Sequence, residues 1–271
     1  MKEREVKKFI QEQGLSFCGL IESKVKECKK EGVLNAIGRS WNVFCNYGSS
    51  PNGRIWLCWN PRDVDVIFIS HSDQVIHCRV FSSSKTWSCV VSVVSWDNCR
   101  VRRTELWADI EASSVGFEGT LWLLLGDLNA IRKRNQAMGG SLDWPTWKND
   151  LDECISWAGL EDLRYGGFYF TWSNRRDEDP TILRKLDRAL INMEWESSLE
   201  GSDVQFLPPG VSDHSPLVVK LADLPRAKIP FKFFDFWADH PDLLHLVASV
   251  WEETVVGTFP GMGVLHLRIN L

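Results

Sequence analysis

Between residues 41 and 95 the chain carries a series of short apolar runs that are separated by turn-forming residues. The runs read WNVFCNY, RIWLCWN, DVIFIS, QVIHCRVFS and WSCVVSVVS. Apolar runs of this length, with Gly, Pro, Asn and Ser between them, are typical of short strands joined by tight connections. We therefore expect this central part of the chain to be rich in strands.

Helical patterns lie on both sides of this region. Val6, Phe9 and Ile10 have helical spacing, and LSFCGLIES (15–23) after them predicts a strand. A second helix is predicted over 101–113, and Pro145 can begin a third over 145–160, because proline suits the first turn of a helix. Further strands are expected at 120–127, 167–174, 183–192 and 215–222. This order fits neither strict β-α-β alternation nor an all-β pattern, so we predict mixed sheets with helices on their outer faces.

Composition indicates one main domain with an appendage. With 271 residues, of which 44% are apolar and 25% charged, the chain can bury a large single core. From about residue 222 the pattern changes to prolines, an aromatic cluster and one amphipathic helix at about 241–253. We predict a main domain over 1–222 and a tail over 223–271.

The cysteines and the N-terminus indicate an intracellular protein. Eight cysteines are scattered without a C-x-x-C pair, which fits neither a zinc ribbon nor a disulfide scaffold. The chain is charged from Lys2 and has no apolar run long enough for a signal peptide or a membrane span. We expect a nuclear or cytoplasmic protein that needs no membrane and no small-molecule cofactor.

Polar residues end several predicted strands. They are Glu22, Asp127, Asn129, Thr171, Asn174, Asp187, Ser212, Asp213 and His214. Each has an ordinary structural explanation: an Asp-x-Asn after a strand is more often a turn or a helix cap than a catalytic pair. Glu22 alone would be a solvated end residue, and Asp187 could pair with Arg184 or Arg188. His214 alone would be a structural histidine.

Together, these residues indicate phosphate chemistry. Carboxylates that meet at one rim can hold Mg²⁺, which prefers oxygen ligands and keeps phosphate oxygens in its shell. An imidazole backed by a carboxylate can bind or protonate a phosphoryl group, and an Asp-Asn pair can orient an attacking water. Phosphodiester or phosphomonoester hydrolysis requires such a set.

Four motifs in a fixed order carry a family resemblance. GDLNA (126–130), FTWSN (170–174), KLDRALIN (185–192) and SDHSPLVV (212–219) resemble the endonuclease/exonuclease/phosphatase superfamily, specifically the endonuclease domain of plant LINE-type (non-LTR) retrotransposons. The likeness covers roughly residues 3–222. FFDFWADHPDLLHLVASVWEE resembles the segment that joins this endonuclease to a reverse transcriptase, a partner domain absent from this chain. The resemblance implies a DNase I-like four-layer sandwich, DNA as partner and Mg²⁺ (or Mn²⁺) as cofactor.

The resemblance also implies roles for the polar residues. Glu22 would bind the metal, with Asp213 beside the metal and the nucleophile. Asp127 would orient or deprotonate the attacking water, and Asn129 would contact the phosphate or the transition state. The remaining residues would act around the scissile phosphate: His214 as a direct contact, Asp187 as the residue that orients it, and Thr171 and Ser212 as supporting or phosphate-contacting hydrogen bonders.

Basic residues near the motifs are candidates for DNA contacts. Arg132, Lys133 and Arg134 directly follow the expected site, and Trp172 lies in a motif-bearing loop. The alternative is that the basic residues form a solvated face. Because the formal net charge is −5, overall charge alone would not attract DNA, and a local basic surface would be needed.

Two departures from the family keep two classes of function open. Related domains begin with a W-N-x-R-G-L strand whose asparagine is catalytic, and we expect that first strand to be missing here. Ser95 and Trp96 stand where the family has a tyrosine. The first function is a Mg²⁺-dependent endonuclease, with a phosphatase as a variant. The alternative is a catalytically impaired retroelement remnant that keeps the fold and at most binds nucleic acid weakly.

Overall fold

The computed structural model describes most of the chain up to residue 221 and one later segment. The described residues are 2–23, 25–38, 40–50, 54–84, 86–96, 100–141, 143–175, 181–210, 212–221 and 261–266. The α-helices are α1 (Lys2–Glu12), α2 (Lys30–Ile37), α3 (Arg100–Gly116), α4 (Asp150–Trp157) and α5 (Met193–Ser198). Short 3-10 turns are η1 (Glu27–Lys29), η2 (Arg134–Gln136) and η3 (Thr146–Asn149).

The strands form two large sheets and one small one. A seven-stranded sheet has the order β10 (Tyr165–Gly167), β14 (Asp203–Phe206), β15 (Leu217–Lys220), β16 (Gly261–His266), β1 (Leu15–Ile21), β3 (Ile55–Trp59) and β2 (Asn42–Cys45). A six-stranded sheet has the order β4 (Val64–His71), β5 (Val75–Ser82), β6 (Ser88–Ser95), β7 (Trp122–Asp127), β13 (Asp187–Ile191) and β9 (Glu161–Asp162). The small sheet contains β11 (Trp172–Ser173), β12 (Leu183–Arg184) and β8 (Ala137–Met138).

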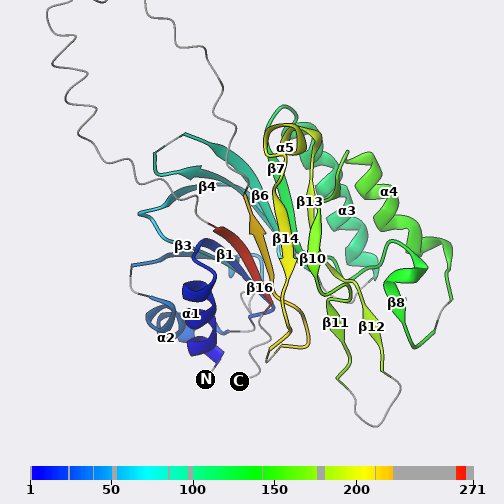
Figure 1. The fold of residues 1–271 in the computed structure, drawn as a ribbon, viewed down its shortest axis with the longest axis horizontal. Coiled ribbons are helices and arrows are strands. Elements are labelled where there is room, and N and C mark those ends of the chain that lie inside the picture. The colour runs from blue at the N-terminus through cyan, green and yellow to red at the C-terminus, as the bar shows by residue number, and fades with distance from the viewer. Residues whose placement is uncertain are drawn as a thin grey trace, which may run out of the picture.

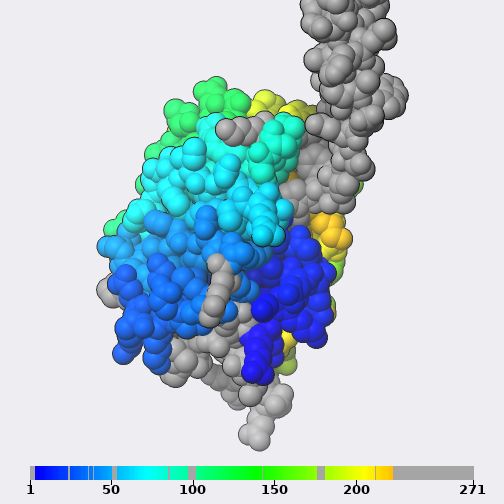
Figure 2. Space-filling view, turned by 90° about the vertical axis from the view of Figure 1, so that its left-hand side faces the viewer, coloured from blue at the N-terminus to red at the C-terminus, as the bar shows by residue number. Residues whose placement is uncertain are grey.

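The two large sheets pack face to face between two layers of helices (Figure 1). Residues from both sheets, such as Phe17 of β1 and Leu123 of β7, form the core between them. Helices α3 and α4 cover the outer face of the six-stranded sheet, while α1 and α2 cover the seven-stranded sheet. Figure 2 views the molecule from the side of α1 and α2. The predicted four-layer α/β sandwich is confirmed.

Strand β7 shows how the pattern of side chains builds these layers. Leu123 and Leu125 enter the core between the sheets, whereas Trp122 and Leu124 face α3 and α4. Gly126 then has φ 132°, and a Cβ there would lie 2.1 Å from the carbonyl oxygen of Val94. Only glycine allows this close approach of β7 to β6. The close packing of β7 against β6 therefore explains the glycine that precedes Asp127 at the end of the apolar run.

Two predicted runs are broken into shorter strands. The run 167–174 contains the end of β10 and the whole of β11, and the run 183–192 contains β12 and β13. Thr171 lies between β10 and β11, and its backbone N–H donates to the carbonyl of Arg184 at 2.9 Å. The chain therefore leaves the main sheet in both runs to build the small sheet.

Residues 261–266, within the expected tail, form a strand of the seven-stranded sheet. We expected residues 223–271 to form a tail beyond the main domain. Instead, β16 pairs in parallel with β1 and antiparallel with β15 inside the seven-stranded sheet. Buried backbone groups on both neighbours require partners, and β16 supplies them. The predicted helix at 241–253 lies outside the described residues, so a domain boundary near 222 stays a prediction.

Most of the described cysteines are buried as free thiols. Burial raises the pKa of the Cys89 and Cys154 thiols to about 12, which makes them weak nucleophiles. None of the helices in the described ranges combines the length and the apolar character that crossing a bilayer requires.

Candidate active site

Three buried polar side chains meet at one end of the sandwich. Asp127 ends β7 and is paired in register with Asp187, which begins β13. His214 precedes β15 of the other large sheet. One ligand atom from each of the three lies within 4.8 Å of the other two. Strand pairing brings Asp127 and Asp187 together within one sheet, and the packing of the two sheets brings His214 next to them.

Asp187 determines that Nδ1 of His214 carries a proton. The Asp187 Oδ2 atom lies 2.8 Å from Nδ1 of His214, and both side chains are buried. A carboxylate can only accept, so Nδ1 carries the proton. In the neutral ring Nε2 is then the atom with the lone pair, and in the charged ring it becomes a second donor.

The Asp-x-Asn sequence forms a turn and also shapes the site. The backbone N–H of Asn129 donates to Asp127 Oδ1 at 2.8 Å, as in an Asx turn. Asn129 has φ 45°, a left-handed conformation that asparagine tolerates better than most residues. The ordinary interpretation of this motif as a turn is therefore correct, and the turn holds the Asp127 carboxylate in place.

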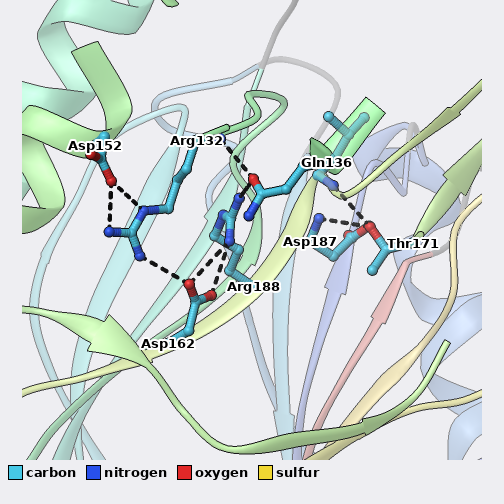
Figure 3. A network of polar contacts seen from close by, with 8 residues as sticks. Arg132, Gln136, Asp152, Asp162, Thr171, Asp187 and Arg188 are labelled. Atoms are coloured by element: carbon cyan, nitrogen blue, oxygen red, sulfur yellow. Dashed lines mark hydrogen bonds and ion pairs between the residues drawn. The ribbon is translucent and has the colours of Figure 1, made fainter. Parts of the chain in front are cut away.

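Thr171 and Ser212 hold the two ends of the Asp187–His214 pair. Thr171 Oγ1 accepts hydrogen bonds from the backbone N–H groups of Leu186 (3.0 Å) and Asp187 (2.9 Å), as Figure 3 shows for Asp187. Ser212 Oγ accepts from the backbone N–H of His214 at 3.2 Å. Both residues therefore act through the backbone of a site residue, which fits the expected supporting role.

A cleft of about 370 Å³ lies next to this cluster. It is lined by Glu22, Arg103, Asn129, Ala130, Ile131, Trp147, Lys148, Leu151, Trp172, Arg184, Leu186 and His214. Glu22 directly follows β1 and has φ 52°. Trp172 Nε1 donates to Asp213 Oδ2 at 3.2 Å, which ties the last predicted site residue to the same cleft. Glu22, Asn129 and His214 therefore line the cleft, whereas Asp127 and Asp187 are buried behind it and Asp213 is joined to it through Trp172.

Sequence reasoning missed the side of the cleft that α3 and η3 provide. Arg103 of α3 lies over the Trp96 ring, 4.3 Å from its centroid, and 5.7 Å from the centroid of Trp147. Lys148 lies 5.9 Å from the Trp147 ring. Arg103 belongs to a basic cluster visible in the sequence, but no motif pointed to Trp147 or Lys148. This side brings positive charge and aromatic surface to the cleft.

Arg132 lies in a partly buried ion-pair network (Figure 3). Its Nε donates to Asp152 of α4 at 2.7 Å, and its Nη1 donates to Asp162 of β9 at 2.9 Å. Asp162 also accepts from the fully buried Arg188 at 3.0 Å. Burial by itself raises the pKa of Asp162, but the cations Arg188, Lys185 and Arg132 outweigh it and hold that pKa below its ordinary value.

This network changes the expectation for the basic run at 132–134. Arg132 already binds two carboxylates and joins α4 to β9, so its guanidinium is a poor candidate for binding DNA. Lys133 and Arg134 are exposed, and for these two residues DNA contact stays a prediction. Trp172 is half-buried at the cleft, and its expected contact with DNA also stays a prediction.

The residues around the cleft fit a hard divalent cation. Glu22, Asp127 and Asp213 offer oxygen atoms, the ligands that Mg²⁺ and Mn²⁺ prefer. Ser95 is paired in register with Asp127, so its side chain lies on the same face of the sheet. Its buried Oγ has no hydrogen-bond partner among the described residues. A bound ion with its water shell would supply such a partner.

The fold is that of the endonuclease/exonuclease/phosphatase proteins. Among solved structures, the endonuclease domain of TRAS1, a telomere-specific non-LTR retrotransposon, is 12% identical, over 76% of this chain and 97% of that domain, with a TM-score of 0.56. An endonuclease/exonuclease/phosphatase family protein from Bacteroides thetaiotaomicron is 11% identical, over 82% of this chain and 89% of its own, with a TM-score of 0.54. TDP2 from D. rerio, complexed with a single strand DNA product, is 13% identical, over 79% of this chain and 88% of its own, with a TM-score of 0.52. No protein-family model and no curated protein matches the sequence.

Proposed function

We propose that this chain is a divalent-metal-dependent phosphodiester hydrolase of the retrotransposon endonuclease type, which nicks DNA. The observation that carries the proposal is the meeting of Asp127, Asp187 and His214 within 4.8 Å beside a cleft. A carboxylate held by a turn, next to a carboxylate-imidazole pair, is an arrangement that can activate water and stabilise a phosphoryl transition state.

Each of the three residues has a defined task in this proposal. Asp127, fixed by the Asn129 N–H, orients the attacking water and accepts its proton. Asp187 keeps the proton on Nδ1 of His214, so that Nε2 is the ring nitrogen available to contact the substrate. In the charged ring, Nε2–H donates to an oxygen of the scissile phosphate, where negative charge develops.

The remaining cleft residues hold the cofactor and the substrate. Glu22 and Asp213 are the proposed ligands of Mg²⁺ or Mn²⁺, which when bound neutralises phosphate charge and stabilises the leaving oxygen. The Asn129 amide contacts a phosphate oxygen. Arg103 and Lys148 bring the local positive charge that a chain of net charge −5 needs in order to bind DNA.

The test is nicking of a supercoiled plasmid by the full chain. We expect Mg²⁺-dependent conversion to open circles that stops when EDTA is added. Asp127→Asn should lower the rate by about 10²- to 10³-fold, because it removes one oriented group from the transition state. Asp65→Asn, on strand β4 away from the site, is the matched control and should nick like the wild type.

The same assay separates the proposal from its alternative. A wild-type chain that binds the plasmid but nicks no faster than Asp127→Asn would be a fold with weak nucleic-acid binding and no catalysis. Nicking that survives Asp127→Asn unchanged would show that the site has been placed wrongly or that a contaminating nuclease is present.

A further inference from the structure

The centre of the seven-stranded sheet is occupied by a strand from far along the chain. Strand β16 runs parallel to β1, with Leu15 opposite Gly261 and Ile21 opposite His266. On its other side it runs antiparallel to β15, with Leu217 opposite Val264. Residues 222–260 separate β16 from the end of the preceding described segment.

Strand β16 alone joins the two halves of this sheet. On one side lie β1, β3 and β2, and on the other lie β15, β14 and β10. Within the described ranges, no other ladder connects these two groups. Without β16, β1 and β15 would therefore present two facing edges one strand apart. All residues of β1 and most of β15 are buried, so their backbone groups would be costly to leave unpaired.

We propose that the slot between β1 and β15 is a binding site for one extended peptide strand. Residues 261–266 fill it from within the chain, and the same segment supplied from outside can replace them. Main-chain hydrogen bonds to two flanking strands provide the affinity, as in other cases of strand addition. The long connection lowers the effective concentration of the internal strand, which favours exchange compared with a strand held by a tight hairpin.

The slot also determines the spacing of the candidate active site. Glu22 directly follows β1, and His214 stands three residues before β15. With β16 in place, β1 and β15 are two strand spacings apart, about 9.6 Å. Loss of β16 would remove the strand that holds β1 and β15 at this spacing, so the distance between Glu22 and His214 would no longer be fixed. This consequence for catalysis rests on the proposed function, whereas the binding of a strand does not.

The test uses the full chain with Val264→Pro. Proline in a central strand removes a ladder hydrogen bond and is poorly tolerated, so the variant should vacate the slot and lose about 10 °C in thermal midpoint. A labelled peptide of residues 260–271 should then bind the variant saturably and restore the midpoint. The control is the same peptide with proline at the position of Val264, which should neither bind nor stabilise. Wild-type protein should bind the labelled peptide much more weakly, because its own strand competes.

Each result bears on the strand site separately from catalysis. If the variant does not fold alone, recovery of the far-ultraviolet circular dichroism signal on adding the peptide takes the place of the midpoint. A variant with the wild-type midpoint, or one that the peptide neither binds nor restores, would overturn the proposal. Peptide binding with restored stability but without nicking, in a chain whose wild-type form also does not nick, would contradict the proposed function and leave the strand site standing.

Discussion

Asp187 and His214 share a 2.8 Å hydrogen bond, although one begins a strand of the six-stranded sheet and the other precedes a strand of the seven-stranded sheet. The bond therefore crosses the sandwich at the end where the cleft opens. Because Asp187 also pairs in register with Asp127, the position of His214 depends on the packing of both sheets. Any change that shifts one sheet against the other should disturb this pair.

Asp187→Asn should impair catalysis through His214. Asparagine keeps the size of the side chain but not its charge, so it no longer holds the Nδ1 proton in place. We expect kcat for cleavage of a DNA duplex to fall by about 10- to 100-fold, as for other positioning partners, with little change in KM. The matched control is Asp109→Asn, because Asp109 also faces a buried histidine, His77, at 3.6 Å. Similar rates for both variants would argue against a positioning role for Asp187.

Thr171→Val should destabilise the fold more than Thr171→Ser. Valine removes the oxygen that accepts from the backbone N–H groups of Leu186 and Asp187, whereas serine keeps it. Leaving buried donors without an acceptor typically costs about 1–3 kcal/mol each. Denaturant unfolding of the three proteins measures the difference. If valine costs no more than serine, the hydrogen bonds of the hydroxyl are not what stabilises this junction.

Arg132 and its two neighbours should respond differently to alanine substitution. Lys133→Ala and Arg134→Ala should each reduce the slope of log affinity for DNA against log salt concentration by about 0.9, with little change in stability. Arg132→Ala should instead lower the free energy of unfolding by about 1–3 kcal/mol, because Asp152 and Asp162 lose a charged donor. Salt titrations of DNA binding together with denaturant unfolding distinguish the two effects. A stable Arg132→Ala protein with a reduced salt slope would reverse the assignment.

Lys185 should make stability rise with pH in the alkaline range. Burial lowers the pKa of its ammonium group from an ordinary 10.5 to about 8, with Arg188 and Arg132 adding to this and Asp162 opposing it. The group lies 3.5 Å from the centroid of the Tyr165 ring. Between pH 8 and 10.5, Lys185 therefore binds more protons in the unfolded chain than in the folded chain. Its contribution to the free energy of unfolding therefore increases with pH in this range.

The measurement compares wild type with Lys185→Met across this range. Buried thiols, whose pKa values are raised, act in the opposite direction, but they are common to both proteins and cancel in the difference. The free energy of unfolding of the wild type minus that of the variant should increase from pH 8 upward. A constant difference would show that Lys185 titrates normally.

The sequence predicted the layers and the three central residues for a physical reason. Asp127, Asp187 and His214 all stand where an apolar run stops or starts, and strand ends meet at the rim of a sheet. Successive side chains of a strand point to opposite faces of the sheet, and in the run of β7 the side chains on both faces are apolar. Such a run indicates a sheet that is covered on both sides.

The features that the sequence did not predict depend on pairing between distant segments. GMGVLH has two glycines and no clear alternation, and its place in the sheet is determined by the open edges of β1 and β15. The Arg132 network depends on α4 and β9, whose approach no local pattern reveals. Trp147 reaches the cleft only because η3 precedes α4, which packs on the outer face of the sheet.

The most direct test of the central claim is a double-mutant cycle for DNA cleavage with Asp127→Asn and His214→Ala. If both residues act on one phosphoryl group, each single substitution should lower the rate constant by about 10²- to 10³-fold. The double variant should then be hardly slower than the slower single variant, because groups that act as a unit are not additive. Effects that simply add in free energy, or a wild-type rate in either single variant, would contradict a single hydrolytic site formed by these residues.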